Sequence, residues 1–226
     1  MTIEPIAHFS SPFATKFGIP RQSGVVAELR GRIVMAPQYA SPEALRGLEG
    51  FDYLWLVWGF SANAGAPKHL TVRPPRLGGN VRMGVFATRS PFRPNNLGLS
   101  SVRLESIDLN AAGGPQICVS GADLMDGTPI YDIKPYVAFT DSHAGARSGF
   151  VDTERWGTLR VEYGKGMLDC MDEADAAALL RVLEQDPRPQ YHDDPRRTYG
   201  MPFGRWDVRF TVSDGVLRIV EMAARG

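Results

Sequence analysis

The segment Tyr53-Leu-Trp-Leu-Val-Trp-Gly-Phe60 is the most informative about the fold, because apolar side chains occupy almost every position in it. Successive side chains of a β-strand point to opposite faces of the sheet. One face of this strand carries Tyr53, Trp55 and Val57, and the other carries Leu54, Leu56, Trp58 and Phe60. A strand that is apolar on both faces is buried on both sides. We expect one face to line a barrel and the other to lie under a loop or a partner subunit.

The sequence on either side of this segment also favours short strands. The further candidates are separated by clusters of Gly, Pro and Asn, and they are Ile3–Phe9, Gly24–Leu29, Arg32–Met35, Val81–Thr88, Leu99–Leu109, Gln116–Ala122 and Ile130–Val137. Only Pro42–Leu48 is predicted to be helical in this part, with Ser41 as its N-cap. Because no long helix alternates with the strands, the pattern does not indicate βαβ units. The predicted fold class is mainly β, with a single-sheet β-barrel as the core domain.

The pattern changes after about Asp141, where small polar residues at Ser142–Gly149 indicate a linker. The elements predicted beyond it are a strand at Thr158–Tyr163, a helix at Asp172–Gln185, and strands at Asp207–Ser213 and Val216–Met222. The pair Asp214-Gly215 between the last two strands is a strong hairpin signal. We therefore predict a β-barrel domain at residues 1–145 and a smaller C-terminal α+β domain at residues 146–226.

Composition limits the class of protein. The chain has 226 residues, 43% of them apolar, and a formal net charge of zero, so no overall field attracts nucleic acid. Cys118 and Cys170 belong to no CxxC pair or Cys/His cluster, and the four histidines lie far apart, so we predict no metal site. The N-terminus lacks a signal-peptide pattern, and no segment reaches the ~20 apolar residues that span a bilayer. We expect a cytoplasmic protein with no membrane partner.

Charge is nevertheless placed unevenly. Between Tyr53 and Leu104 there is no acidic residue, and the basic residues there are Lys68, Arg73, Arg76, Arg82, Arg89, Arg93 and Arg103. Arginine presents forked donors that match phosphate oxygens, which favours binding of a nucleic acid or another polyanion. The alternative is that these arginines pair with acids from elsewhere in the fold. Phe92, between arginines, either stacks on a base or plugs a rigid turn.

Catalytic motifs of the common kinds are absent: the sequence has no GxGxxG after a strand, no P-loop, no HExxH and no GxSxG. After the turn pair Asp126-Gly127, one strand face would carry Asp132, Lys134 and Tyr136. This row is either a catalytic or ligand-binding row or an ordinary ion-paired strand face. Nothing in composition or spacing indicates a particular cofactor.

Several longer segments, however, resemble a known family. They are Pro20-Arg-Gln22, Val72-Arg-Pro-Pro-Arg-Leu-Gly-Gly-Asn80, Met83-Gly-Val-Phe-Ala-Thr-Arg-Ser90, Phe92-Arg-Pro-Asn95, Asp126-Gly-Thr-Pro129 and Asp132-Ile-Lys-Pro-Tyr136. In order and spacing they resemble the motifs of the TrmO (YaeB/TsaA-like) family of tRNA adenosine N6-methyltransferases. The segments Gln185-Asp-Pro-Arg-Pro189 and Asp207-Val-Arg209, with Tyr199, resemble the C-terminal domain of that family.

The resemblance implies a homodimeric β-barrel enzyme that uses S-adenosylmethionine and acts next to the anticodon of tRNA. The implied substrate is N6-threonylcarbamoyladenosine at position 37, methylated on N6. The implied cofactor-binding residues are Pro20, Arg21, Gln22, Ser61, Ala62, Arg89, Leu99, Asp126, Gly127, Thr128 and Pro129. This chain departs from the family pattern at Ser61-Ala62, where His-Gln is typical, and at Asn96, where proline is typical.

Methylation of N6 requires loss of its proton, which a nearby base or a polarising cation assists. The candidates are Asp126, Asp132, Lys134 and Tyr136, in no particular order. The predicted contacts to the tRNA anticodon loop are Arg73, Arg76 and Arg93. The alternative function is a non-catalytic RNA-binding or regulatory β-barrel module on the same scaffold, and binding of S-adenosylmethionine discriminates between the two.

Overall fold

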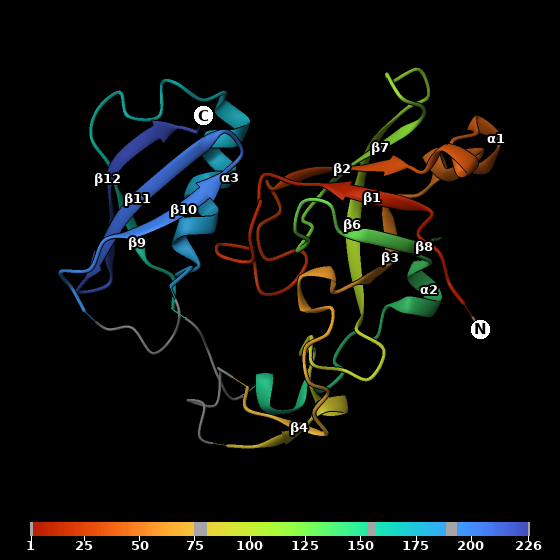
Figure 1. The fold of residues 1–226 in the computed structure, drawn as a ribbon, viewed down its shortest axis with the longest axis horizontal. Helices are drawn as coiled ribbons and strands as arrows, with labels where there is room; N and C mark the ends of the chain where they lie inside the picture. The colour runs from red at the N-terminus through yellow and green to blue at the C-terminus, as the bar shows by residue number, and fades with distance from the viewer. Residues whose placement is uncertain (1, 75–80, 153–156, 189–193, 226) are drawn as a thin grey trace.

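The computed structural model describes residues 2–74, 81–152, 157–188 and 194–225 (Figure 1). Its N-terminal part is a closed barrel in the strand order β1-β2-β7-β6-β3-β8. The strands are β1 (Ala7–Ser10), β2 (Arg30–Met35), β3 (Tyr53–Gly59), β6 (Leu97–Asp108), β7 (Gln116–Ser120) and β8 (Pro129–Pro135). Every neighbouring pair is antiparallel. The predicted mainly-β fold with a barrel core is confirmed.

The two faces of β3 behave as its sequence predicts. Leu54, Leu56 and Trp58 point into the barrel and are buried, together with residues such as Ile33, Val102, Ile117 and Ile130 from the other strands. Trp58 lies against Gly98 of β6, where an added Cβ would sit 2.3 Å from the indole ring. The outer residue Trp55 is half-buried and donates its indole N–H to Asp141 at the end of α2 (Ala138–Asp141). Part of the second layer over β3 thus comes from this helix.

Two predicted strands are wrong. Residues 24–29 form turns, because Val26 and Leu29 turn away to pack into the C-terminal core. In the predicted strand Val81–Thr88 only β5 (Met83–Gly84) is extended, and it pairs with β4 (Thr71–Val72). A 3-10 turn at Val85–Ala87 follows, and the Thr88 hydroxyl donates to the Val85 carbonyl within it.

The helix predicted at Pro42–Leu48 is shorter than expected. It begins as predicted, since the Ser41 hydroxyl accepts from the Glu43 N–H, but α1 (Pro42–Leu45) ends early. Arg46 leaves the helical conformation with a ψ of 124°, Gly47 follows with a φ of 85°, and a separate 3-10 turn forms at Leu48–Gly50.

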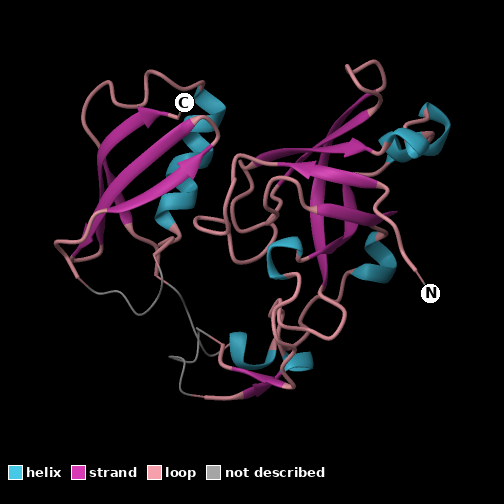
Figure 2. Cartoon of the chain, in the orientation of Figure 1, coloured by secondary structure: helices cyan, strands magenta, loops and turns pink. Residues whose placement is uncertain are grey.

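The C-terminal part is a second sheet covered by one helix (Figure 2). Its strand order is β10-β11-β12-β9, with β9 (Arg160–Glu162), β10 (Tyr199–Phe203), β11 (Trp206–Ser213) and β12 (Val216–Ala224). Asp172 caps α3 (Glu173–Glu184), and Asp214 and Gly215 both have positive φ, as the hairpin signal requires. Strand β10 was not predicted, because Gly200 and Pro202, which disfavour a strand, lie between its buried residues Tyr199, Met201 and Phe203 at the sheet edge.

The long connection between β1 and β2 belongs to both parts of the chain. Phe13, Val26 and Leu29 from this connection are buried in the cluster formed by α3 and the C-terminal sheet. The domain boundary at residue 145 stays a prediction. These three side chains come from the N-terminal part of the chain and pack in the core of the C-terminal part. Among the described residues, no helix is long and apolar enough to cross a bilayer.

Candidate functional site

The strand topology gathers the predicted cofactor residues at one end of the barrel. Because neighbouring strands are antiparallel, the connections β1–β2, β3–β6 and β7–β8 leave and enter the barrel at the same end. Pro20–Gln22 lie in the first connection, Ser61, Ala62 and Arg89 in the second, and Asp126–Thr128 in the third. Leu99 and Pro129 lie in the strands that start at this end.

Two of these connections meet through side chains. The Arg89 guanidinium donates a hydrogen bond to the Gln22 side-chain oxygen, across 67 residues of sequence. A backbone hydrogen bond of 2.8 Å from Gly24 N–H to the Gly121 carbonyl holds the first connection against the third. Pro20 is buried, whereas Arg21 is exposed. Within the motif Pro20–Gln22, Pro20 is thus packed in the protein interior, Gln22 is bonded to Arg89, and the Arg21 side chain reaches the surface.

A buried polar chain that sequence analysis missed lies behind this contact. The Trp58 indole N–H donates to the Ser100 hydroxyl at 3.0 Å, and that hydroxyl donates to Asp123 Oδ1 at 2.6 Å. Burial raises the pKa of the Asp123 carboxyl, against the opposing effects of the Ser100 hydrogen bond, of N–H groups of Asp123 and Ser23, and of the Arg89 charge. The signal in the sequence was a single acid between the apolar residues Ala122 and Leu124.

The turn Asp126–Pro129 is locked onto the end of β1. Asp126 Oδ1 accepts from the Ser11 N–H at 3.0 Å, and Gly127 N–H donates to the Phe9 carbonyl at 2.8 Å. Gly127 has a φ of 73°, a conformation that favours glycine. Thr128 is buried and its hydroxyl donates to the Met125 carbonyl. The Asp126 carboxylate thus ties this turn to the backbone that follows β1.

Both departures from the family pattern fall in the β3–β6 connection. Ser61 and Ala62 are exposed and start a 3-10 turn that continues to Asn63. Asn96 has a φ of 51°, which asparagine tolerates and proline cannot adopt, since its ring fixes φ near −65°. The Asn96 carbonyl accepts from Phe60 N–H at 2.9 Å, so this turn sets the path of the chain into Ser61.

The four catalytic candidates do not lie close together in the structure of the single chain. Asp132 and Lys134 form an ion pair of 3.3 Å on the outer barrel face, the arrangement that the ion-paired alternative describes. Cross-strand pairing places Asp132, Val57 and Leu99 in one row of that face. Tyr136 lies at the other end of the barrel, where it packs on Trp55. Seven residues of strand, about 23 Å at 3.3 Å each, separate it from Pro129.

The arginines predicted to contact tRNA differ in their surroundings. Arg73 is exposed, and in the part of the chain that the structure describes it forms no salt bridge. Arg93 is half-buried and its guanidinium donates to the carbonyls of Val85 at 3.2 Å and Thr88 at 2.6 Å, so it braces the turn before Arg89. Arg76 lies outside the described residues.

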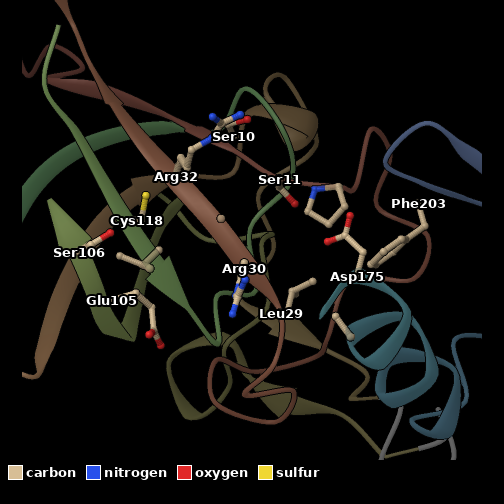
Figure 3. Close-up of a pocket in the computed structure, with 14 residues that line it drawn as sticks. Ser10, Ser11, Leu29, Arg30, Arg32, Glu105, Ser106, Cys118, Asp175 and Phe203 are labelled. Atoms are coloured by element: carbon tan, nitrogen blue, oxygen red, sulfur yellow. The ribbon is translucent and has the colours of Figure 1, made fainter. Parts of the chain in front are cut away.

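Two cavities flank the C-terminal part. One, of about 600 Å³, separates β2 from α3, and Arg30, Asp175 and Phe203 line it (Figure 3). No predicted site residue within the described ranges lines this cavity. The other, of about 400 Å³, lies between Pro20–Arg21 and the end of α3 at Gln185–Arg188. Only the second cavity therefore borders the predicted cofactor residues.

The donor set at this barrel end suits a ligand with both apolar and charged parts. Leu99 is an apolar side chain that is 55% exposed, while Arg89 and Gln22 supply a cation and an amide. These groups fit the adenosine and the zwitterionic amino acid of S-adenosylmethionine. Among the residues that the structure describes, no group of three or more His, Cys, Asp or Glu side chains gathers as metal ligands would.

Comparison with known proteins identifies the family. Residues 8–142 match the tRNA-methyltransferase O N-terminal domain, and residues 159–225 match the TrmO C-terminal domain. The tRNA (adenine(37)-N6)-methyltransferase of Escherichia coli is 36% identical over 230 residues, which cover 98% of this chain and 97% of that protein. A Pseudomonas aeruginosa relative that bears the name of an S-adenosylmethionine-dependent methyltransferase is 38% identical over 98% of this chain and 97% of its own length.

A solved structure agrees with these sequence matches. The crystal structure of TrmO from Pseudomonas aeruginosa superimposes with a TM-score of 0.79 at 32% identity, covering 99% of this chain and 98% of that chain. Similarity therefore extends through the barrel and the C-terminal sheet alike. The chain belongs to the tRNA-methyltransferase O (TrmO) family.

Proposed function

We propose that this chain is an S-adenosylmethionine-dependent methyltransferase that methylates N6 of adenine 37 in tRNA. The Escherichia coli relative bears the name of this activity and matches nearly the whole chain. The observation that carries the proposal is the hydrogen bond from Arg89 to Gln22, because it joins two segments with implied cofactor contacts at one barrel end. With tRNA as its substrate, the enzyme would act in the cytoplasm.

The cofactor would be held by Pro20–Gln22, Ser61, Ala62, Arg89, Leu99 and the turn Asp126–Pro129. When bound, it supplies an electrophilic methyl group on a sulfonium. The chain's contribution is to fix the acceptor nitrogen in line with that methyl group, about 3 Å away, which is the main source of rate in such a displacement. The locked turn at Gly127 and the Arg93-braced turn at Val85 provide rigid elements for this positioning.

The acceptor that we propose is the N6-threonylcarbamoyl form of adenine 37, whose N6 lone pair is delocalised into the ring and the carbamoyl group. Such a nitrogen attacks only as its proton leaves. Asp132 is the proton acceptor that we favour among Asp126, Asp132, Lys134 and Tyr136, because it shares a cross-strand row with Leu99. Lys134, paired with Asp132 at 3.3 Å, would hold that carboxylate in place on the strand face.

We also propose that the tRNA anticodon loop lies across the acid-free segment between β3 and β6. Arg73 and Arg93 would contact its phosphates, as would Arg76. Arg73 is exposed and forms no salt bridge within the described ranges, so its charge is available to a phosphate. Arg93 already donates hydrogen bonds to the carbonyls of Val85 and Thr88, so a contact with tRNA would be additional to these bonds.

We further propose that the enzyme is a homodimer. The outer face of β3, β6 and α2 exposes apolar side chains, with Tyr53 43%, Leu99 55% and Phe139 92% exposed. Large apolar side chains exposed on one side of a protein are typical of an interface. A second copy on this face would also bring further groups to a cofactor site in which Leu99 takes part.

The experiment that tests the proposed function has two arms. Calorimetric titration with S-adenosylmethionine and with its demethylated product tests cofactor binding; no binding to either, at high protein concentration, would refute the enzyme. Mass spectrometry of tRNA nucleosides, incubated with cofactor in the presence and absence of the protein, tests the product. Cofactor binding and the N6-methylated nucleoside are expected, whereas tRNA binding without either would identify a non-catalytic RNA-binding module.

A further inference from the structure

The hairpin of β4 and β5 exposes large apolar side chains for which the proposed reaction has no use. Leu70, directly before β4, is 79% exposed, and Phe86, just after β5, is 75% exposed. The two segments adjoin, because the Val85 N–H donates to the Leu70 carbonyl at 2.9 Å. Figure 1 shows β4 at its lower edge, away from the barrel strands. Single exposed apolar residues are ordinary, but several on one element mark a binding surface.

The backbone that carries Phe86 is firmly held. Val85, the preceding residue, is 1% exposed and begins the 3-10 turn Val85–Ala87. Its carbonyl accepts from the Thr88 hydroxyl at 2.9 Å and from the Arg93 guanidinium at 3.2 Å. The same guanidinium donates to the Thr88 carbonyl at 2.6 Å. A side chain on a backbone that is already fixed loses less conformational freedom when it binds a ligand.

The charged residues of this hairpin favour a polyanion as the partner. Lys68, Arg73 and Arg82 are exposed, and no acidic residue occurs between Tyr53 and Leu104. Within the described ranges, none of these three cations forms a salt bridge. A second copy bound here by two-fold symmetry would place the same cations against one another, which costs energy. Cations interspersed with exposed rings instead suit single-stranded nucleic acid, whose phosphates pair with the cations and whose bases stack on the rings.

Phe92, the ring between the arginines of the same segment, is less suited to stacking on a base. It is 36% exposed, and its ring meets the His69 ring edge-on at 6.0 Å between centroids. The His69 N–H also donates to the Phe92 carbonyl at 3.5 Å. Phe92 therefore supports the hairpin from within, whereas Phe86 presents the more exposed ring.

We propose that Phe86 stacks on a base of the anticodon loop beside the acceptor adenine and so orients that loop toward the cofactor. The inference rests on the proposed function, because it requires tRNA as the substrate. Arg89, which bonds to Gln22 at the cofactor end, lies three residues further along, at most about 11 Å of extended chain. Stacked bases follow one another at ~3.4 Å, so this length corresponds to about three nucleotides. Phe86 thus reaches a near neighbour of the base that is methylated.

Three substitutions of Phe86 test whether it stacks. We expect Phe86→Ala to weaken binding of threonylcarbamoyl-modified tRNA at least about fivefold, because it removes the ring. Phe86→Leu keeps apolar area without a ring and should bind within about twofold of the alanine variant, whereas Phe86→Trp should bind as tightly as the wild type. The matched control is Tyr39→Ala, which removes an exposed ring beyond the other end of β2 and should bind normally.

Two further measurements separate stacking from other roles. Stacking makes no phosphate contact, so Phe86→Ala should keep the wild-type slope of the logarithm of the tRNA-binding constant against the logarithm of salt concentration. An anticodon stem-loop RNA with 2-aminopurine next to adenine 37 should be quenched when saturated by the wild type and less quenched by Phe86→Ala, because stacking quenches this base. Since the side chain is 75% exposed, Tm and cofactor affinity should not change.

Several results would overturn the proposal. Wild-type tRNA binding by Phe86→Ala would do so, as would full binding by Phe86→Leu, which would show a general apolar contact. A shift of Phe86→Ala from dimer to monomer in light scattering would also overturn it and assign the hairpin to contact between two copies. If Phe86→Ala does not fold, the comparison of Phe86→Leu with Phe86→Trp replaces it.

The proposed function fails separately from this inference. It fails when the wild type yields no N6-methylated nucleoside in tRNA. A wild type that methylates tRNA, together with a Phe86→Ala variant that binds tRNA equally well, would overturn the role of Phe86 alone.

Discussion

At the scale of single residues, Asp132 is the one whose chemistry most directly tests the proposed reaction. Asp132→Asn removes the proton acceptor but keeps the size of the side chain. We expect kcat to fall about 10²- to 10⁴-fold, the usual contribution of general base catalysis, with cofactor affinity unchanged. Single-turnover assays with modified tRNA provide the measurement. A normal kcat would leave the Asp132–Lys134 pair as an ordinary ion pair of the strand face.

Gly98 shows how one residue sets the packing of the barrel end. A Cβ at this position would lie 2.3 Å from the Trp58 ring, and the displaced indole would lose its hydrogen bond to Ser100. We expect Gly98→Ala to lower the free energy of unfolding by about 1–3 kcal/mol, the usual cost of overpacking. The control is Gly84→Ala, whose φ of −58° and open surroundings accept a methyl group. Urea titration of both variants measures the difference; equal stability would contradict it.

At the scale of elements, the turn Val85–Ala87 depends on Arg93 for its shape. Arg93→Ala removes two hydrogen bonds from a charged donor to carbonyl oxygens, which we expect to cost about 1–3 kcal/mol and to lower Tm. Arg73→Ala, directly after β4, should leave Tm unchanged. It should instead reduce the slope of the logarithm of the tRNA-binding constant against the logarithm of salt concentration by somewhat under one unit. An unchanged Tm with a reduced slope for Arg93→Ala would show that its main contact is with tRNA.

At the scale of the whole molecule, the exposed apolar face predicts the assembly state. Phe139 is 92% exposed on α2, beside the outer face of β3. We expect Phe139→Ser to shift a dimer toward monomer in light scattering at micromolar concentration. Val220→Ser on the C-terminal sheet, where Val220 is 46% exposed, is the control and should stay dimeric. A wild-type monomer at working concentration would refute the homodimer itself.

Features that depend on neighbours along the chain could be predicted from the amino-acid sequence. Alternation in Tyr53–Gly59 placed Trp58 inside the barrel, Ser41 and Asp172 capped their helices, and Asp214-Gly215 formed the predicted hairpin turn. Local periodicity and turn chemistry are sufficient for such features. The motif resemblance further indicated the family, which the comparisons confirmed.

Contacts between residues that are distant in the sequence became known only from the folded structure. Val26 and Leu29 were predicted to lie in a strand, yet they pack on the C-terminal sheet, because burial against a distant surface outweighs local β-propensity. Asp123 met the Ser100 hydroxyl only when the barrel brought β6 alongside β7. No periodicity encodes such a meeting, since the attraction and desolvation that define it depend on distances across the fold rather than along the chain.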